Sequence, residues 1–214
     1  MTRQTTAAGS RKEQAARTEA DLKSAARRVF ERRGYLNTKI TDITAEAGRA
    51  TGSFYTHFSD KESLLEAMLA DMLAGADAEV HASDTHSPDF SDPRAVRWHV
   101  AAFWRFFSRH RTELVAVQQA ALVDPRFAEH LKQLYAPDVD EIRDHLGRAE
   151  DAGVRLPADI QLTATMMSAL LLQFAMMWLV GPSMGRTLDD DEAVDALTLF
   201  ILYGLHGSGR TRDS

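Results

Sequence analysis

Short polar side chains recur along residues 51–57, TGSFYTH, where their type and spacing suit hydrogen bonding to another molecule. Ser53 and His57 are four residues apart and would share one face of a short helix. Gly52 has no side chain, so backbone N–H groups near the start of that helix could approach a phosphate. The chemistry that this segment suits is noncovalent binding of a polyanion such as DNA.

The sequence offers little for covalent or metal chemistry. The G-x-S-x-G, P-loop and H-E-x-x-H patterns are absent. There are no cysteines, which excludes disulfides and thiolate metal sites. Of the eight histidines, His81 and His86 flank Asp84, a weak pattern for a ligand set. We therefore predict no catalytic residue, no metal site, no cofactor and no enzymatic activity.

Two short helices and a tight turn must position residues 51–57. Thr38 can cap a first helix through Ala47, and Gly48 then ends it. Arg49 and Ala50 complete the turn before a helix barely two turns long over residues 51–58. Phe54 and Phe58 would fall on one face and pack on apolar residues, namely Phe30, Ile40 and Ile43. A short helix presented in this way can enter the major groove of DNA.

A longer helix on each side supports this pair. Ser10 and Glu13 form a capping-box pattern, and apolar residues at helical spacing continue to Arg33 before Gly34 stops the helix. Its last turns carry Arg27, Arg28, Arg32 and Arg33, which suit the helix dipole, phosphate contacts or both. Ser59 and Glu62 form a second capping box for a fourth helix, with Lys61 in its first turn.

Charge is distributed unevenly along the 214 residues. Residues 1–62 carry 12 Lys/Arg against 8 Asp/Glu, a net charge of +4, and the remainder carries 13 against 23, a net charge of −10. A basic first segment on an acidic remainder is typical of a head that meets polyanion and a body that does not. The apolar share of 44% is enough for a core, and no charged-then-apolar leader opens the chain, so we expect a cytoplasmic protein.

Residues spaced through 34–65 resemble the DNA-binding domain of the tetracycline-repressor (TetR) family. The resemblance covers roughly residues 17–66 and rests on Gly34-Tyr35, Thr38, Ile43, Ala47-Gly48, Gly52-Ser53-Phe54-Tyr55, His57-Phe58, Lys61-Glu62 and Leu64-Leu65. Three residues depart from the common pattern: Thr44 replaces Ala, Arg49 a small apolar residue, and Ala50 the capping Ser. Losing that cap costs about 1 kcal/mol, so the departures bear on the DNA sequence that is read rather than on the fold.

The resemblance implies an all-α fold and assigns roles to particular residues. It implies a flexible tail over 1–9, a helix-turn-helix domain over 10–66, a helical effector-binding and dimerisation domain over 67–207, and a tail over 208–214. Base-edge contacts are expected from Thr41, Thr51 and Ser53. Phosphate contacts are expected from Thr38, Lys39, Tyr55, His57 and Lys61, with Gly52 admitting the backbone and Arg49 adding a base or phosphate contact.

The remaining residues are predicted to form an apolar helical body. Trp, Phe and Met are frequent in 98–107 and 166–178, which suits either a close-packed core or an apolar ligand cavity. Candidate ligand residues are Phe103, Trp104, Phe107, Gln118, Met166, Leu170, Phe174 and Met177. The run 158–180 is apolar enough that a transmembrane helix must be considered, but its five Gln, Thr and Ser residues favour a buried helix. The resemblance implies a homodimer through the last two helices, with candidates Met167, Leu171, Trp178, Leu197, Phe200 and Ile201.

These observations lead to three hypotheses. The first is a homodimeric transcription regulator, a repressor, that is released from a palindromic DNA operator by a small apolar effector. The second is a helical binding or enzymatic module whose DNA-binding head is vestigial, suggested only by Arg49 and Ala50. The third is an activator or a regulator without a ligand.

Overall fold

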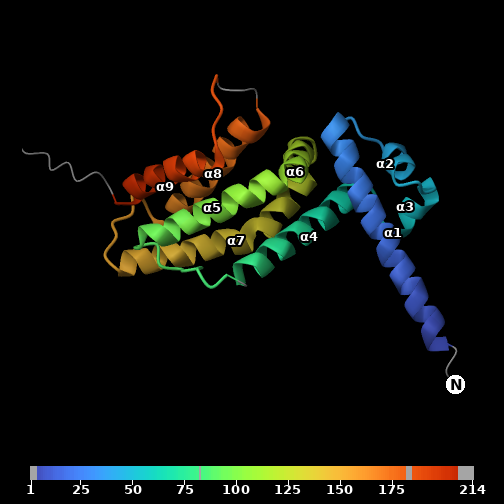
Figure 1. Ribbon diagram of the computed structural model, residues 1–214, viewed down its shortest axis with the longest axis horizontal. Helices are drawn as coiled ribbons and strands as arrows, with labels where there is room; N and C mark the ends of the chain where they lie inside the picture. The colour runs from blue at the N-terminus through green and yellow to red at the C-terminus, as the bar shows by residue number, and fades with distance from the viewer. Residues whose placement is uncertain (1–3, 82, 182–184, 207–214) are drawn as a thin grey trace, which may run out of the picture. The chain divides into compact units, whose positions relative to one another are not determined.

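The computed structural model describes residues 4–81, 83–181 and 185–206, and across these ranges the chain is helical with no strand (Figure 1). The helices are α1 (Gln4–Arg33), α2 (Ile40–Glu46), α3 (Thr51–His57), α4 (Lys61–His81), α5 (Pro93–Arg109), α6 (Arg111–Val123), α7 (Pro125–Asp151), α8 (Ile160–Ala175), the π-helical turn η1 (Met176–Val180) and α9 (Asp190–His206). The predicted all-α fold is confirmed.

The helices form two compact units. The first, called the head, comprises residues 4–74 and 112–129, and the second, called the body, comprises the described residues of 75–111 and 130–206. The head therefore includes α6 and the first turn of α7, which the predicted boundary at residue 66 assigned to the second domain. Sequence proximity could not reveal this, because the grouping follows contacts between residues that are distant in the chain.

In the head, α1 is a long rod with α2 and α3 along one side, and its N-terminal part projects beyond them (Figure 1). It begins at Gln4, before the predicted cap at Ser10, because the preceding Ala- and Thr-containing residues hold no proline to break it. The predicted flexible tail is therefore helical from Gln4, and residues 1–3 lie outside the described ranges. Gly34 ends α1 at a φ of 73°, as predicted, and donates its N–H to Phe30 O at 2.8 Å.

Two predicted caps differ in the structure by one residue. The N-cap of α2 is Lys39, whose N–H donates to Asp42 Oδ2 at 3.0 Å, and not Thr38. Before α4, Asp60 Oδ1 accepts from Ser63 N at 2.7 Å, and Asp60 N donates to Ser63 Oγ at 3.2 Å. This reciprocal pair replaces the predicted Ser59–Glu62 box because a carboxylate accepts more strongly from a helix N-terminus than a hydroxyl does.

The core of the head is formed by the apolar faces of its helices. Its fully buried side chains include Leu22, Ile43, Phe54, Leu64, Leu65 and Leu69. Phe54 and Phe58 are both buried, with ring centroids 5.5 Å apart, so the two rings share one apolar face, as predicted.

In the body, α5 packs against both α8 and α9. The indole N–H of Trp104 donates to Asp190 Oδ1 at 2.7 Å, which satisfies the polar atom of a side chain that is otherwise buried. Phe107 is fully buried one turn later. Helix α7 runs through Pro137 without interruption.

The most apolar segment is only partly buried. By length and composition alone, Ile160–Val180 could cross a membrane, with a mean hydropathy of 1.6, and it is the one such helix in the described ranges. Only 28% of that window is buried within the chain. The prediction of a buried helix therefore holds for one face only, and an apolar face stays open.

The packing of α3 yields a first prediction. Phe54→Ala removes a fully buried ring and should lower the free energy of unfolding by about 3–5 kcal/mol. The neighbouring Tyr55 is 58% exposed, so Tyr55→Ala should change that free energy by no more than about 0.5 kcal/mol. Urea denaturation followed by circular dichroism measures both, and equal losses would show that α3 is not anchored through Phe54.

Candidate nucleic-acid interface

The turn between α2 and α3 is built from backbone hydrogen bonds and one glycine. Gly48 adopts a φ of 63°, a conformation that side chains disfavour, and its N–H donates to Ala45 O at 3.1 Å. Arg49 N–H donates to Thr44 O at 2.8 Å, closing the end of α2. Ala50 occupies the N-cap position of α3 without a side-chain hydrogen bond. The sequence thus specifies a sharp reversal that leaves the first turn of α3 open.

Apart from the buried Phe54, α3 carries the polar residues that the sequence singled out. Thr51, Gly52 and Tyr55 are exposed, and Ser53 and His57 are half-buried. From α2, Thr41 is also exposed. A Cβ placed on Gly52 would meet no atom within 4 Å, so nothing inside the chain requires a glycine there. Together these six residues are the candidate binding surface, which we call the reading face.

Thr38 and Lys61 point into the head rather than outward. Thr38 is buried and its hydroxyl donates to Gly34 O at 2.8 Å. The Lys61 ammonium donates to Tyr35 O at 2.8 Å and to Thr38 O at 3.0 Å, and it lies 4.0 Å from the centre of the Tyr35 ring. Burial lowers the pKa of Lys61. Both side chains, expected on phosphates, thus already have partners that close the turn between α1 and α2.

Arg49 is also engaged within the head. Its Nη2 lies 2.6 Å from Asp21 Oδ2 on α1. This ion pair between the turn and α1 explains an arginine where a small apolar residue is usual, without any contact to DNA. Lys39 differs from it, because its side chain is exposed.

Each of the four arginines near the end of α1 forms an ion pair with a carboxylate. Arg28 Nε and Arg32 Nη2 lie 2.6 and 2.5 Å from the two oxygens of Glu46, and Arg33 Nη1 lies 3.0 Å from Asp42 Oδ1. Hydrogen bonds from Arg28 and Arg32 lower the pKa of Glu46. Arg27 pairs with Glu113, a buried carboxylate on α6. Helix-to-helix ion pairing was a third possibility for these arginines, beside the two that the sequence suggested.

Sequence reasoning missed the polar cluster behind the reading face. Tyr35 is buried, and its hydroxyl donates to Glu62 Oε1 at 2.7 Å. Its backbone N–H donates to Gln119 Oε1 of α6 at 3.0 Å. Burial, together with the Glu62 carboxylate, raises the pKa of Tyr35. The only signal in the sequence was a glutamine in an apolar segment, and that signal favoured a ligand contact equally well.

The exposure of four candidates on α8 and η1 differs from what their expected roles suggest. Met167 and Leu171, proposed for a dimer interface, are 9% and 8% exposed and lie in the core of the body. Met166 and Met177, proposed for a ligand cavity, are 51% and 43% exposed. The cause is helical periodicity, since residues at adjacent positions point in different directions and composition alone cannot choose between them.

The other candidates in the body and α6 divide in the same way. Trp104 and Phe107 are buried, as are Leu197 and Ile201 of α9, which were expected at the dimer interface. Phe200, also expected at the dimer interface, is 66% exposed. Phe103, Leu170, Phe174 and Trp178 are half-buried. Gln118 lies on α6 in the head, in a different unit from the other candidate ligand residues.

Sequence comparison with known proteins finds a family match within the head. Residues 22–68 match the family of bacterial regulatory proteins named tetR. A segment of 82 residues is 38% identical to the transcriptional regulator TtgR of Pseudomonas putida and covers 38% of each chain. The regulator EthR of Mycolicibacterium smegmatis is 27% identical over 112 residues, which cover 52% of this chain and 51% of that one. The aligned segments thus span from about two fifths to half of these relatives.

Comparison with solved structures extends the similarity to the body, where it is a similarity of fold. A bacterial regulatory protein in the tetR family from Rhodococcus RHA1 aligns with a TM-score of 0.72 at 22% identity, covering 88% of this chain and 96% of that one. The regulator FadR from Bacillus subtilis, in complex with stearoyl-CoA, aligns with a TM-score of 0.69 at 14% identity, covering 87% and 99%.

Both lines of comparison agree with the geometry described above. The matched residues include the turn at Gly48, the reading face on α3 and the buried polar cluster at Tyr35. The relatives are named as regulators and none as an enzyme. The head of this chain, over residues 22–68, matches the tetR family of bacterial regulatory proteins, and the chain as a whole shares its fold with a solved structure from that family.

Proposed function

We propose that this protein is a homodimeric, DNA-binding transcriptional repressor of the cytoplasm that reads a palindromic operator with α3. The observation that carries the proposal is the reading face, an exposed polar surface on a short helix whose opposite side is anchored by Phe54. Two such helices related by a twofold axis would enter successive major grooves about 34–36 Å apart. Thr41, Thr51 and Ser53 would contact base edges, and Lys39, Tyr55 and His57 would contact phosphates.

The vestigial-head alternative loses part of its support. It rested on Arg49 and Ala50 as departures from the family pattern. Arg49 has a structural partner in Asp21, and α3 forms without a side-chain cap at Ala50. Neither departure therefore speaks against DNA binding.

The proposed dimer uses the apolar face that α8, η1 and α9 leave open. Large apolar side chains lie exposed there, at Leu162, Met166, Met177, Val180, Leu199, Phe200 and Tyr203. Those of α8 and η1 recur at a spacing of three to four residues or its multiples, which places them along one helical stripe. A large exposed apolar surface of this kind is typical of an obligate interface, and a twofold axis makes the same stripe face itself.

A small apolar effector would act in the body. Phe103, Leu170 and Phe174 are its remaining candidate contacts, and the Phe174 ring centre lies 6.0 Å from that of buried Trp104. One structural relative binds stearoyl-CoA, so long acyl chains are a reasonable first class to test. Binding of the effector would lower DNA affinity through a coupling free energy of roughly 1–3 kcal/mol.

Gly52 provides a sharp test of DNA reading. Gly52→Ala should leave the fold intact, or stabilise it by up to about 1 kcal/mol, because the added methyl meets nothing in the chain. It should weaken operator binding about tenfold or more, since a hydrogen bond to a charged group contributes roughly 1.5–3 kcal/mol. The measurement is fluorescence anisotropy on a palindrome selected from a random duplex library.

Gly75 is a matched control for Gly52, because a Cβ there also meets nothing within 4 Å and the residue lies on α4. Gly75→Ala should leave DNA affinity unchanged. If no duplex is selected at moderate salt, or if both variants bind as the parent does, the proposed reading face is wrong.

Lys39 and Lys61 should respond differently to removal of their charge. Lys39→Ala should reduce the slope of log K against log salt by about 1.8, because the dimer loses one phosphate contact from each protomer at about 0.9 per contact. Lys61→Ala removes the ammonium donor from two carbonyl oxygens, of which Tyr35 O keeps the Thr38 N–H at 3.2 Å, and should lower the free energy of unfolding by about 1–3 kcal/mol. Salt titrations of DNA binding and urea denaturation measure the two effects, and a stability loss at Lys39 equal to that at Lys61 would contradict the assignment.

Phe200 tests the dimer. Phe200→Asp should raise the dimer dissociation constant by at least roughly 30-fold, which corresponds to about 2 kcal/mol for a central interface residue. Sedimentation equilibrium measures the constant. Leu122→Asp is the control, because Leu122 is 85% exposed on α6, and it should leave the dimer intact. A monomeric parent protein, or equal dissociation of both variants, would refute this interface.

A further inference from the structure

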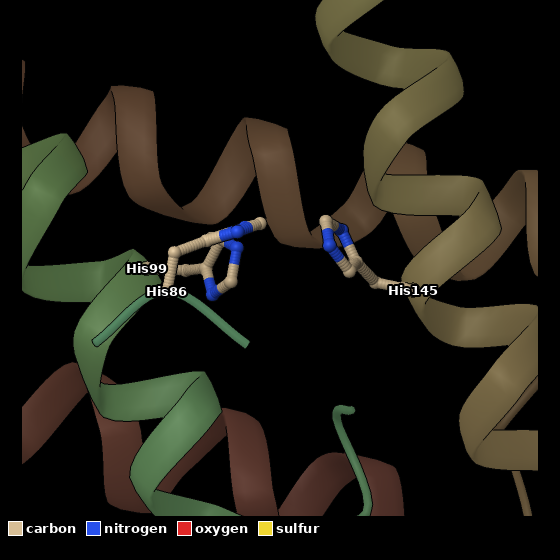
Figure 2. Close-up of side chains that lie close together, drawn as sticks. All are labelled: His86, His99 and His145. Carbon is tan, nitrogen blue, oxygen red and sulfur yellow. The ribbon is translucent and has the colours of Figure 1, made fainter. Parts of the chain in front are cut away.

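Three histidines from separate segments of the body meet in one cluster. His86 comes from the loop before α5, His99 from α5 and His145 from α7, and Figure 2 shows their rings turned toward one another. One ring nitrogen from each lies within 4.8 Å of the others. Sequence analysis missed the cluster because its members are far apart in the chain.

The cluster is buried and leaves ring nitrogens without hydrogen bonds. His145 is 3% exposed and His86 and His99 are half-buried. Nε2 of His86, Nε2 of His99 and Nδ1 of His145 are buried with no hydrogen-bond partner in the described part of the chain. Three such nitrogens in one place cost free energy, because each is removed from water without compensation.

The surroundings hold the imidazoles as neutral ligands. His99 Nδ1 lies 2.9 Å from Ala95 O, so a proton on Nδ1 leaves the Nε2 lone pair free to accept a metal. Burial lowers the pKa of His99, and burial with the nearby His99 and His86 lowers the pKa of His145 to about 4. Both rings therefore stay unprotonated at neutral pH, as metal coordination requires.

Neighbouring side chains fix the rings in place. His145 stacks on the buried Phe90 ring at an interplanar angle of 11° and a centroid distance of 4.9 Å. The loop that carries His86 is tied to α5 by the Trp98 indole, which donates to Thr85 Oγ1 at 2.9 Å. Because packing already fixes these rings, binding a metal ion would cost less conformational entropy.

We propose that His86, His99 and His145 bind one divalent transition-metal ion of the zinc class. Three nitrogens at Zn–N distances of 2.0–2.1 Å in a tetrahedron lie about 3.3 Å apart, so small ring rotations close the 4.8 Å cluster. Imidazole prefers zinc, copper or nickel to magnesium or calcium. Glu141 Oε1, 3.9 Å from His86 Nε2, is the nearest negative charge and a fourth ligand or the partner of a bound water.

The site goes beyond the proposed function, and its test needs no DNA. Untagged full-length protein, stripped with a chelator and desalted, is titrated with Zn²⁺ against a chromogenic competitor, and its thermal midpoint is measured with and without Zn²⁺. The parent should bind one equivalent per chain and melt at a higher temperature with Zn²⁺. Mg²⁺ at the same concentration should do neither. Co²⁺ should give the visible absorption of a tetrahedral site.

Variants identify the ligands. His86→Gln and His99→Gln should each weaken Zn²⁺ binding by at least about 100-fold, because even loss of an outer-shell partner costs 10–100-fold. His130→Gln, at an exposed position on α7, is the control and should bind as the parent does. Circular dichroism checks the fold, and His86 lies in a loop where the substitution disturbs no helix. Absence of stoichiometric Zn²⁺ binding by the parent, or parent-like binding by both variants, would overturn the proposal.

Discussion

The arrangement of the head depends on one part-buried polar cluster, the hydrogen bonds around Tyr35. The turn from α1 to α2 leaves carbonyl oxygens that no helix can satisfy, and Lys61 donates to two of them from the first turn of α4. Gln119 of α6 accepts from the Tyr35 N–H, and Glu62 accepts from the Tyr35 hydroxyl. These hydrogen bonds therefore join four helices around a buried tyrosine. Away from bulk water each hydrogen bond is stronger, and removing one of its partners costs more stability.

The ion pairs of the head change how its charge should be understood. The excess of basic residues in the head suggested a surface that meets polyanion. Many of the arginines instead pair with carboxylates on neighbouring helices, as at Arg28 and Glu46 or at Arg49 and Asp21. What α3 offers to a duplex is a set of short side chains and open backbone, held rigidly from behind. Specific contacts at close range then matter more than a diffuse positive field.

The body combines two features that are easily confused in sequence. Some of its apolar residues form the core of the protomer and others form an exposed stripe. Of two adjacent methionines, Met167 lies in the core and Met166 on the exposed stripe. The same body brings together three histidines that no local pattern connects. A metal ion there would join the loop before α5 to α7, and α5 also packs on the helices that carry the open stripe.

The sequence by itself determined the all-α fold, the turn at Gly48, the anchoring of α3 through Phe54 and the polar residues of the reading face. These follow from local rules: glycine at a positive φ, apolar residues at helical spacing and the chemistry of short side chains. Only the tertiary structure decided that Lys61, Thr38 and Arg49 turn inward, which face of α8 is buried, and that His86, His99 and His145 meet. Those outcomes depend on which distant segments pack together, and side chains of the same type serve equally well on a surface, in a core or as a ligand until the packing is known.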